Sequence, residues 1–74
     1  MPTSSALMPT DREIQVVRLV AAGLSNAQIG ERLWISERTA KQHVSNLRRK
    51  LRARDRAHLV SLCYQAGWLR VDCP

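Results

Sequence analysis

The residues with the most informative chemistry lie between Ser36 and Leu51, where basic and amide side chains recur at helical spacing. At about 100° per residue they share one face of a helix. This face consists of Arg38, Lys41, Gln42, Ser45, Arg49 and Arg52. No Asp or Glu lies between Arg38 and Arg54, whereas a solvated helix usually mixes both charge signs. The pattern favours a face that binds a phosphate backbone and the base edges beside it. The alternative is a basic helix that is merely solvated.

The residue sets that other chemistries need are missing from the sequence. It has no carboxylate pair, Ser/His/Asp set or phosphate-cradling glycine loop, so we do not expect an enzyme. His58 and Cys63 stand five residues apart, about 140° around a helix, and no second pair has metal-ligand spacing. We therefore expect no metal and no cofactor. Cys63 and Cys73 are poorly spaced for a disulfide framework, which predicts reduced thiols.

Length and charge restrict the possible partners. The chain has 74 residues, enough for one domain, and its net charge of +6 indicates a polyanion or an anionic membrane surface. A membrane is disfavoured because no apolar run approaches the roughly 20 residues of a spanning helix. The first nine residues lack the features of a secretory signal, so we expect a soluble, cytoplasmic protein.

A capping box marks the start of the first helix. Thr10, followed three residues later by Glu13, predicts a helix over residues 11–22, and Gly23 supplies a left-handed stop. Residues 1–9 before it are small, polar and marked by prolines, which predicts a flexible N-terminal arm.

A second capping box, Ser25 with Gln28, follows directly and predicts a helix over residues 26–33. Its buried side is expected to consist of Ala27, Ile29 and Leu33. The next three residues, Trp34 to Ser36, are too few for more than a tight turn, which Ile35 would plug.

Ser36 is the expected cap of a third helix over residues 37–52. Opposite its basic face runs a stripe that belongs to a core: Ala40, Val44, Leu47 and Leu51. Two short helices joined by a tight turn, the second with a basic face, form a helix-turn-helix unit. In that unit the second helix lies in the DNA major groove.

Asp55 as N-cap and Gly67 as stop predict a fourth helix over residues 56–66, so the fold class is an all-α, four-helix domain. The fourth helix carries apolar residues around a wide arc, and a second copy would cover those left exposed. The expected dimer contacts are Leu59, Leu62, Cys63 and Ala66. The alternative is that this strip closes on Val17, Val20 and the arm. Residues 70–74 form a tail without periodic pattern.

Motifs along nearly the whole chain support this organisation. They are Thr10-x-Arg12-Glu13, Gly23-Leu24-Ser25-Asn26, Ile29, Arg32-Leu33, Ile35-Ser36, Thr39, Lys41, His43-Val44, Asn46 and Lys50-Leu51. Over residues 10–69 the sequence resembles the LuxR-type (GerE/NarL-type) helix-turn-helix family. The resemblance implies a DNA-binding domain of bacterial transcription regulators, in which the third helix reads DNA and the fourth forms a two-fold dimer.

The resemblance also implies roles for single residues. Base contacts would fall on Arg38, Lys41, Gln42 and Ser45, the face that the helical spacing selects independently. Phosphate contacts would fall on Ser25, Asn26, Ser36, Thr39, Arg48, Arg49 and Lys50. Helix N-termini and arginines suit phosphate, although Ser25 and Ser36 have capping as a compatible alternative role. His43 is expected at the boundary of the core.

The sequence departs from the family pattern at three positions. Pro9 replaces a usual Leu, Ala40 a usual Val, and Arg52 a usual Gly. Ala40 is expected to leave the core slightly underpacked, unless Trp34 or Tyr64 fills the space. The cost in stability relative to a larger aliphatic residue is about 1 kcal/mol. Arg52 suggests a third helix that extends without a glycine cap.

Most members of the family carry this domain behind a receiver or ligand-binding domain, so the chain resembles a stand-alone member; an excised domain is the alternative. The expected function is a sequence-specific, DNA-binding transcriptional regulator, with double-stranded DNA as partner and a homodimer on an inverted repeat. The alternative function is a protein-interaction module that heterodimerises with a larger relative or contacts RNA polymerase.

Overall fold

The computed structural model describes residues 9–69, and in this part of the chain it contains four helices and no strand. They are α2 (Asp11–Ala21), α3 (Asn26–Leu33), α4 (Glu37–Leu51) and α5 (Arg56–Gln65). The all-α prediction is confirmed. Apart from Pro9, the predicted arm (1–9) and tail (70–74) lie outside the described residues. None of the described helices is long and apolar enough to span a membrane.

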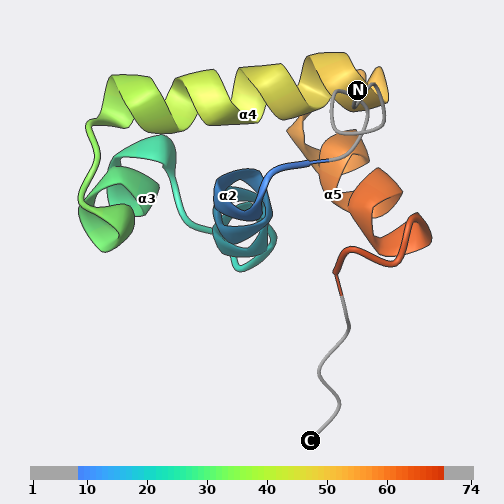
Figure 1. Cartoon of the computed structure of the whole chain (residues 1–74), viewed down its shortest axis with the longest axis horizontal. Coiled ribbons are helices and arrows are strands. Elements are labelled where there is room, and N and C mark those ends of the chain that lie inside the picture. The colour runs from blue at the N-terminus through green and yellow to red at the C-terminus, as the bar shows by residue number, and fades with distance from the viewer. Residues whose placement is uncertain (1–8, 70–74) are drawn as a thin grey trace, which may run out of the picture.

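The longest helix, α4, organises the fold. It packs against α2, α3 and α5, which lie along one of its sides (Figure 1). No other described helix lies on the opposite side of α4 (Figure 1).

Each helix begins at the predicted capping residue. The four N-caps are Thr10, Ser25, Ser36 and Asp55. Both capping boxes are complete: the Thr10 hydroxyl accepts a hydrogen bond from the Glu13 backbone N–H at 3.1 Å, and the Glu13 carboxylate accepts one from the Thr10 N–H at 2.9 Å. The helix starts therefore follow from local sequence, since each cap satisfies free N–H groups of its own first turn.

The helix ends lie close to the predicted residues, but α4 does not extend through Arg52. α2 and α5 each end one residue before the predicted boundary, and Gly23 and Gly67 take positive φ angles of 93° and 82° as expected. The expectation that Arg52 extends α4 is wrong, because Arg52 has φ 55° and itself occupies the left-handed position. A Schellman motif requires that conformation: the Ala53 N–H donates to the Arg48 carbonyl at 2.9 Å.

The core is formed by side chains from all four helices and from Leu69. Its members are Val16, Val17, Val20, Ile29, Ala40, Val44, Leu47, Leu59, Cys63 and Leu69. Ala27, predicted on the buried side of α3, is exposed. It stands two positions from Ile29, which corresponds to about 200° around the helix and hence to the opposite face.

Neither aromatic side chain that could have compensated for the small Ala40 does so. Ala40 is fully buried, but Trp34 is 93% exposed and Tyr64 is 38% exposed, so neither serves as a core residue there. Trp34 instead ends α3 in the left-handed conformation, with φ 61°.

Candidate nucleic-acid interface

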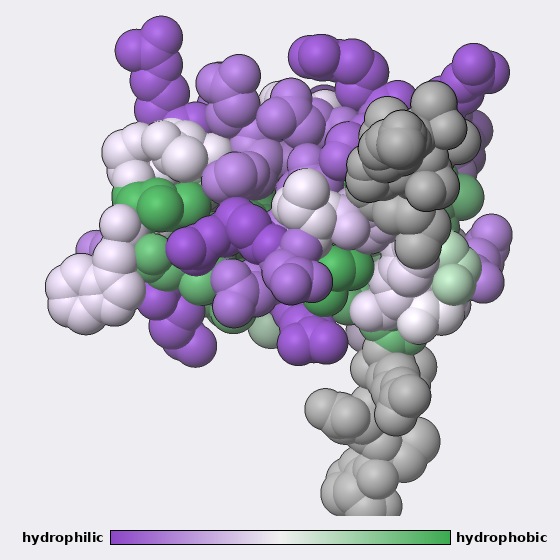
Figure 2. Space-filling model, in the orientation of Figure 1, coloured by the Kyte–Doolittle hydropathy of each residue, from purple (hydrophilic) through white to green (hydrophobic). Residues whose placement is uncertain are grey.

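The open side of α4 carries the residues that the sequence singled out. Arg38, Lys41, Gln42 and Arg49 are exposed, and Ser45 is half-buried. Hydrophilic side chains crowd the edge of the molecule along which α4 runs (Figure 2). The opposite side of the helix is held in the core by Ala40, Val44 and Leu47, all buried. Burial of that stripe fixes the rotation of α4, so the basic and amide side chains face outward together.

The first turn of α4 holds two hydroxyl groups in contact. The Ser36 Oγ accepts a hydrogen bond from the Thr39 N–H at 3.0 Å and donates one to the Thr39 Oγ1 at 2.9 Å. The capping role expected of Ser36 is thus present. The Thr39 hydroxyl proton remains available for another acceptor, because its oxygen serves as acceptor in this pair.

The start of α3 is organised by a residue that the sequence analysis missed. The Arg56 Nη1 donates to the Asn26 Oδ1 at 2.8 Å, and its Nη2 donates to the Leu24 carbonyl at 2.6 Å. Ser25 caps the helix beside them, with its Oγ accepting from the Gln28 N–H at 3.2 Å. The sequence carries no local sign of this contact, since 30 residues separate Arg56 from Asn26.

Gly30 sets the distance between α3 and the turn before α4. A Cβ at Gly30 would lie 2.6 Å from the Ile35 carbonyl oxygen and 3.2 Å from the Glu37 nitrogen. Both are backbone atoms, so they cannot move aside as a side chain can. The turn thereby packs directly on α3, and this contact fixes where α4 begins. Sequence analysis had assigned Gly30 no role.

Lys50 differs from the other predicted phosphate contacts. Its Nζ forms an ion pair with the Glu13 Oε1 at 2.8 Å, and the side chains are 24% and 6% exposed. Burial raises the pKa of Glu13, but hydrogen bonds from Lys50 and from the Thr10 backbone, with the charges of Lys50 and His43, outweigh it and lower the pKa. We therefore assign Lys50 an ion pair that joins α4 to α2, in addition to its predicted phosphate contact.

Arg48 remains exposed but has an internal contact. Its Nη2 donates to the Arg54 carbonyl at 2.9 Å, in the segment that joins α4 to α5. A guanidinium has five N–H donors, so this bond leaves others for a phosphate.

The predicted dimer surface on α5 is smaller than expected. Leu59 and Cys63 are fully buried in the chain's own core, so their assignment to a dimer contact is wrong. Both belong to the core cluster that includes residues of α2 and α4, and both of these helices pack on α5. Of the four predicted residues, Leu62 is half-buried and Ala66 is exposed. Burial also raises the pKa of the Cys63 thiol, which favours its protonated form.

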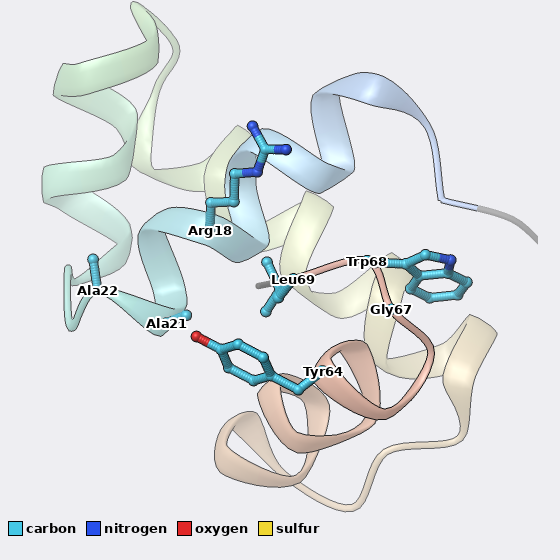
Figure 3. A pocket seen from close by; sticks show the side chains of 7 residues that line it. All are labelled: Arg18, Ala21, Ala22, Tyr64, Gly67, Trp68 and Leu69. Carbon is cyan, nitrogen blue, oxygen red and sulfur yellow. The ribbon is translucent and has the colours of Figure 1, made fainter. Parts of the chain in front are cut away.

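A pocket lies at the C-terminal ends of α2 and α5, away from the basic face. Figure 3 shows Tyr64 directed across it towards Ala21, with Trp68 and Leu69 from the segment after α5. None of the lining residues belongs to α4. Within residues 9–69, no three His, Cys, Asp or Glu side chains are grouped as a metal site would require.

The chain is similar in sequence to several proteins that are named as regulators. The chain is 45% identical to the transcriptional regulatory protein DegU of Brevibacillus brevis over 62 residues, which is 84% of the chain and 26% of that protein. It is 51% identical to LnrK of Bacillus subtilis over 58 residues, 78% of the chain and 26% of that protein. It is 48% identical to the nitrate/nitrite response regulator NarP of Escherichia coli over 56 residues, 76% of the chain and 26% of that protein.

The chain thus spans about a quarter of the length of these relatives, and they are named as regulators rather than enzymes. The family model of bacterial regulatory proteins, luxR family, matches residues 9–63, which include α2, α3, α4 and most of α5. This protein therefore belongs to the luxR family of bacterial regulatory proteins.

Proposed function

We propose that this protein binds double-stranded DNA sequence-specifically and regulates transcription, with α4 in the major groove. The observation that carries the proposal is the division of α4 into a buried apolar stripe and an exposed face of basic and amide groups. The major groove admits a helix and presents acceptors and donors that such groups can distinguish.

The proposed contacts divide by chemistry. Base edges would be read by Arg38, Lys41, Gln42 and Ser45, which lie on the outward face of α4. Phosphates would be held by Ser25, Asn26, Ser36, Thr39, Arg48, Arg49 and Lys50, where two helix N-termini and the basic last turn of α4 meet the groove edges. The protein would act in the cytoplasm, where bacterial DNA lies.

Two copies would bind an inverted repeat through α5, because one small domain offers a limited interface for a regulator's affinity. Of the four predicted dimer contacts, Leu62 and Ala66 remain accessible to a partner. Half-site centres would lie about one helical turn apart. Contact with RNA polymerase or with a related regulator is the rival role, in which DNA binding is secondary.

The proposal is tested by selecting preferred sites from a random duplex pool and then measuring affinities of variants. Lys41→Ala and Gln42→Ala should each lower discrimination by about 1–3 kcal/mol, because each removes a base-edge contact. Arg49→Ala should weaken binding to all duplexes alike, because it removes one phosphate contact. The slope of the logarithm of the binding constant against the logarithm of the salt concentration should fall in magnitude by about one unit. Enrichment of no sequence from the pool would favour the protein-interaction role. An unchanged preference in Lys41→Ala would show that the reading face is misassigned.

A further inference from the structure

The side chain of Arg56 joins two helices whose backbones do not pack against each other. Among the four described helices, α3 and α5 are the pair without direct packing. Arg56, the first residue of α5, reaches across to Asn26, the first residue of α3, and to the Leu24 carbonyl just before it. Both contacts, at 2.8 and 2.6 Å, are part-buried.

The chemistry of this contact determines how the Asn26 amide is oriented. A guanidinium has donors and no acceptor, so the amide branch that faces Arg56 must be the oxygen. The other branch, the Nδ2 amino group, then points away from Arg56 and keeps its donors for another acceptor. Without Arg56, the Asn26 amide could rotate and present either its oxygen or its nitrogen.

The second bond of Arg56 holds the backbone next to the same helix end. Leu24 precedes the Ser25 cap, and the bond to its carbonyl restrains the chain as it enters α3. At this end the first N–H groups of the helix have no acceptor within the helix and suit an anion. The guanidinium also adds a positive charge beside them.

We propose that Arg56 is a positioning residue for DNA phosphate binding: it fixes the Asn26 amide with its amino group outward and holds the start of α3 towards the backbone. This inference rests on the proposed function, because it assigns Asn26 to a phosphate. It links α5, the proposed dimer helix, to a DNA-contacting helix end through one planar side chain.

The test is a double-mutant cycle on the full chain, with a fluorescently labelled random-sequence duplex as the probe. Asn26→Ala should weaken binding by about three- to tenfold, because one exposed hydrogen bond to DNA is lost. Arg56→Lys should weaken it by a similar factor, because an ammonium keeps the charge but cannot reproduce the planar fork. The double variant should lose less affinity than the product of the two single losses, because both substitutions remove the contact between Arg56 and Asn26. Arg54→Lys, two positions earlier, is the matched control and should bind like the wild type.

Two further measurements separate positioning from general stability. Circular dichroism must show each variant folded at the assay temperature, and Arg56→Gln provides a second variant in which the same non-additivity with Asn26→Ala is expected. In the free protein, Arg56→Lys should shift the side-chain amide resonances of Asn26, whereas Arg54→Lys should not.

Three outcomes would overturn the inference. They are wild-type affinity in both Arg56 variants, losses that multiply with Asn26→Ala, and unshifted Asn26 amide resonances in Arg56→Lys. Multiplying losses would mean that Arg56 affects DNA binding independently of Asn26. A wild-type chain that fails to bind the duplex at low salt would instead overturn the proposed function, so the two failures are distinguishable.

Discussion

At the scale of single residues, Glu13 combines a local and a long-range role. Its carboxylate accepts from the Thr10 N–H in the capping box and from the Lys50 ammonium of α4, both within 2.9 Å. It is 4% exposed, and a carboxylate buried to that degree needs such partners to remain charged. Together these bonds tie the first turn of α2 to the last turn of α4.

Glu13→Gln should separate the two roles, because Gln at this position preserves the capping box and removes the charge. We expect a loss in the free energy of unfolding of about 1–3 kcal/mol at neutral pH. The pKa of Glu13 is lowered in the folded state, so its contribution is present above the ordinary value of 4.5 and disappears as the pH falls through the folded-state pKa. Urea titrations of both proteins at several pH values measure this difference.

The exposed Glu31 supplies the control, since Glu31→Gln should change stability little at any pH. A wild-type advantage over Glu13→Gln that stays constant down to about pH 3 would contradict the ion-pair explanation.

Arg52 is a second residue with a definite energetic expectation. Its φ of 55° strains a residue with a Cβ by about 1–2 kcal/mol, more than the backbone entropy that glycine loses on folding. Arg52→Gly should therefore stabilise the fold by about 0.5–1 kcal/mol and raise the midpoint of urea unfolding. Arg54→Gly removes the same charge at a residue without positive φ and should destabilise the protein. Equal effects of the two substitutions would rule out backbone strain as the cause.

At the scale of elements, the contact between α3 and the turn before α4 is set by backbone atoms. The Ile35 N–H donates to the Gly30 carbonyl at 2.9 Å, and a side chain at Gly30 would clash with the Ile35 carbonyl. The position of the first turn of α4 thus depends on the lack of a Cβ in α3. Since Ser36 and Thr39 lie in that turn, the proposed phosphate contacts depend on it as well.

Gly30→Ala tests this contact against helix propensity. Alanine favours a helix over glycine by about 1 kcal/mol, so without a clash the variant would be more stable than the wild type. We expect instead a loss of about 1–3 kcal/mol from the overpacked junction, with weaker DNA binding because α4 is displaced. Thermal unfolding by circular dichroism and duplex binding measure the two effects. Ala27→Gly, at an exposed position of the same helix, calibrates the propensity term. A stabilised Gly30→Ala variant would show that the turn yields without cost.

At the scale of the whole molecule, α4 lies between an interior that it shares with three helices and an outer side that no other described helix covers (Figure 1). Polar contacts between the described helices supplement the apolar core, among them Lys50 with Glu13 between α4 and α2, and Arg56 with Asn26 between α5 and α3. The second contact connects the proposed dimer helix to the proposed DNA surface. Dimerisation and DNA binding would then act through one rigid unit.

The dimer prediction concerns two copies on one duplex. Burial of Leu59 and Cys63 leaves Leu62 and Ala66 as the accessible residues of the predicted strip, and a single short helix pair buries less area than a standard stable interface. We therefore expect a monomer at micromolar concentration and cooperative binding to a duplex with two inverted half-sites. Leu62→Glu should abolish the cooperativity and keep the affinity for a single half-site, as measured by titrating both duplexes. Ser61→Glu, at an exposed neighbouring position, controls for the added charge. Non-cooperative binding by the wild type would exclude the dimer.

The sequence by itself was sufficient to predict the helices and the residues on the outward face of α4. Capping bonds such as that of Ser36 with Thr39 span three residues. Helical spacing alone places Gln42 on the other side of α4 from Val44, because two positions correspond to about 200°. These features depend on neighbours within one or two turns, so they can be inferred without knowing which helices meet. The error at Arg52 arose because the left-handed cap is imposed by backbone hydrogen bonds and tolerates a residue other than glycine.

Tertiary structure alone decided which polar groups are paired within the molecule and which apolar groups are buried in it. Lys50 and Glu13 are 37 positions apart, and Arg56 and Asn26 are 30 apart, so no local pattern relates them. Leu59 and Cys63 carry the same apolar signature as Leu62, yet the packing of α2 and α4 on α5 buries the first two and leaves the third partly accessible. A side chain's chemistry is present in the sequence, but its availability to DNA or to a second copy depends on which helix lies over it.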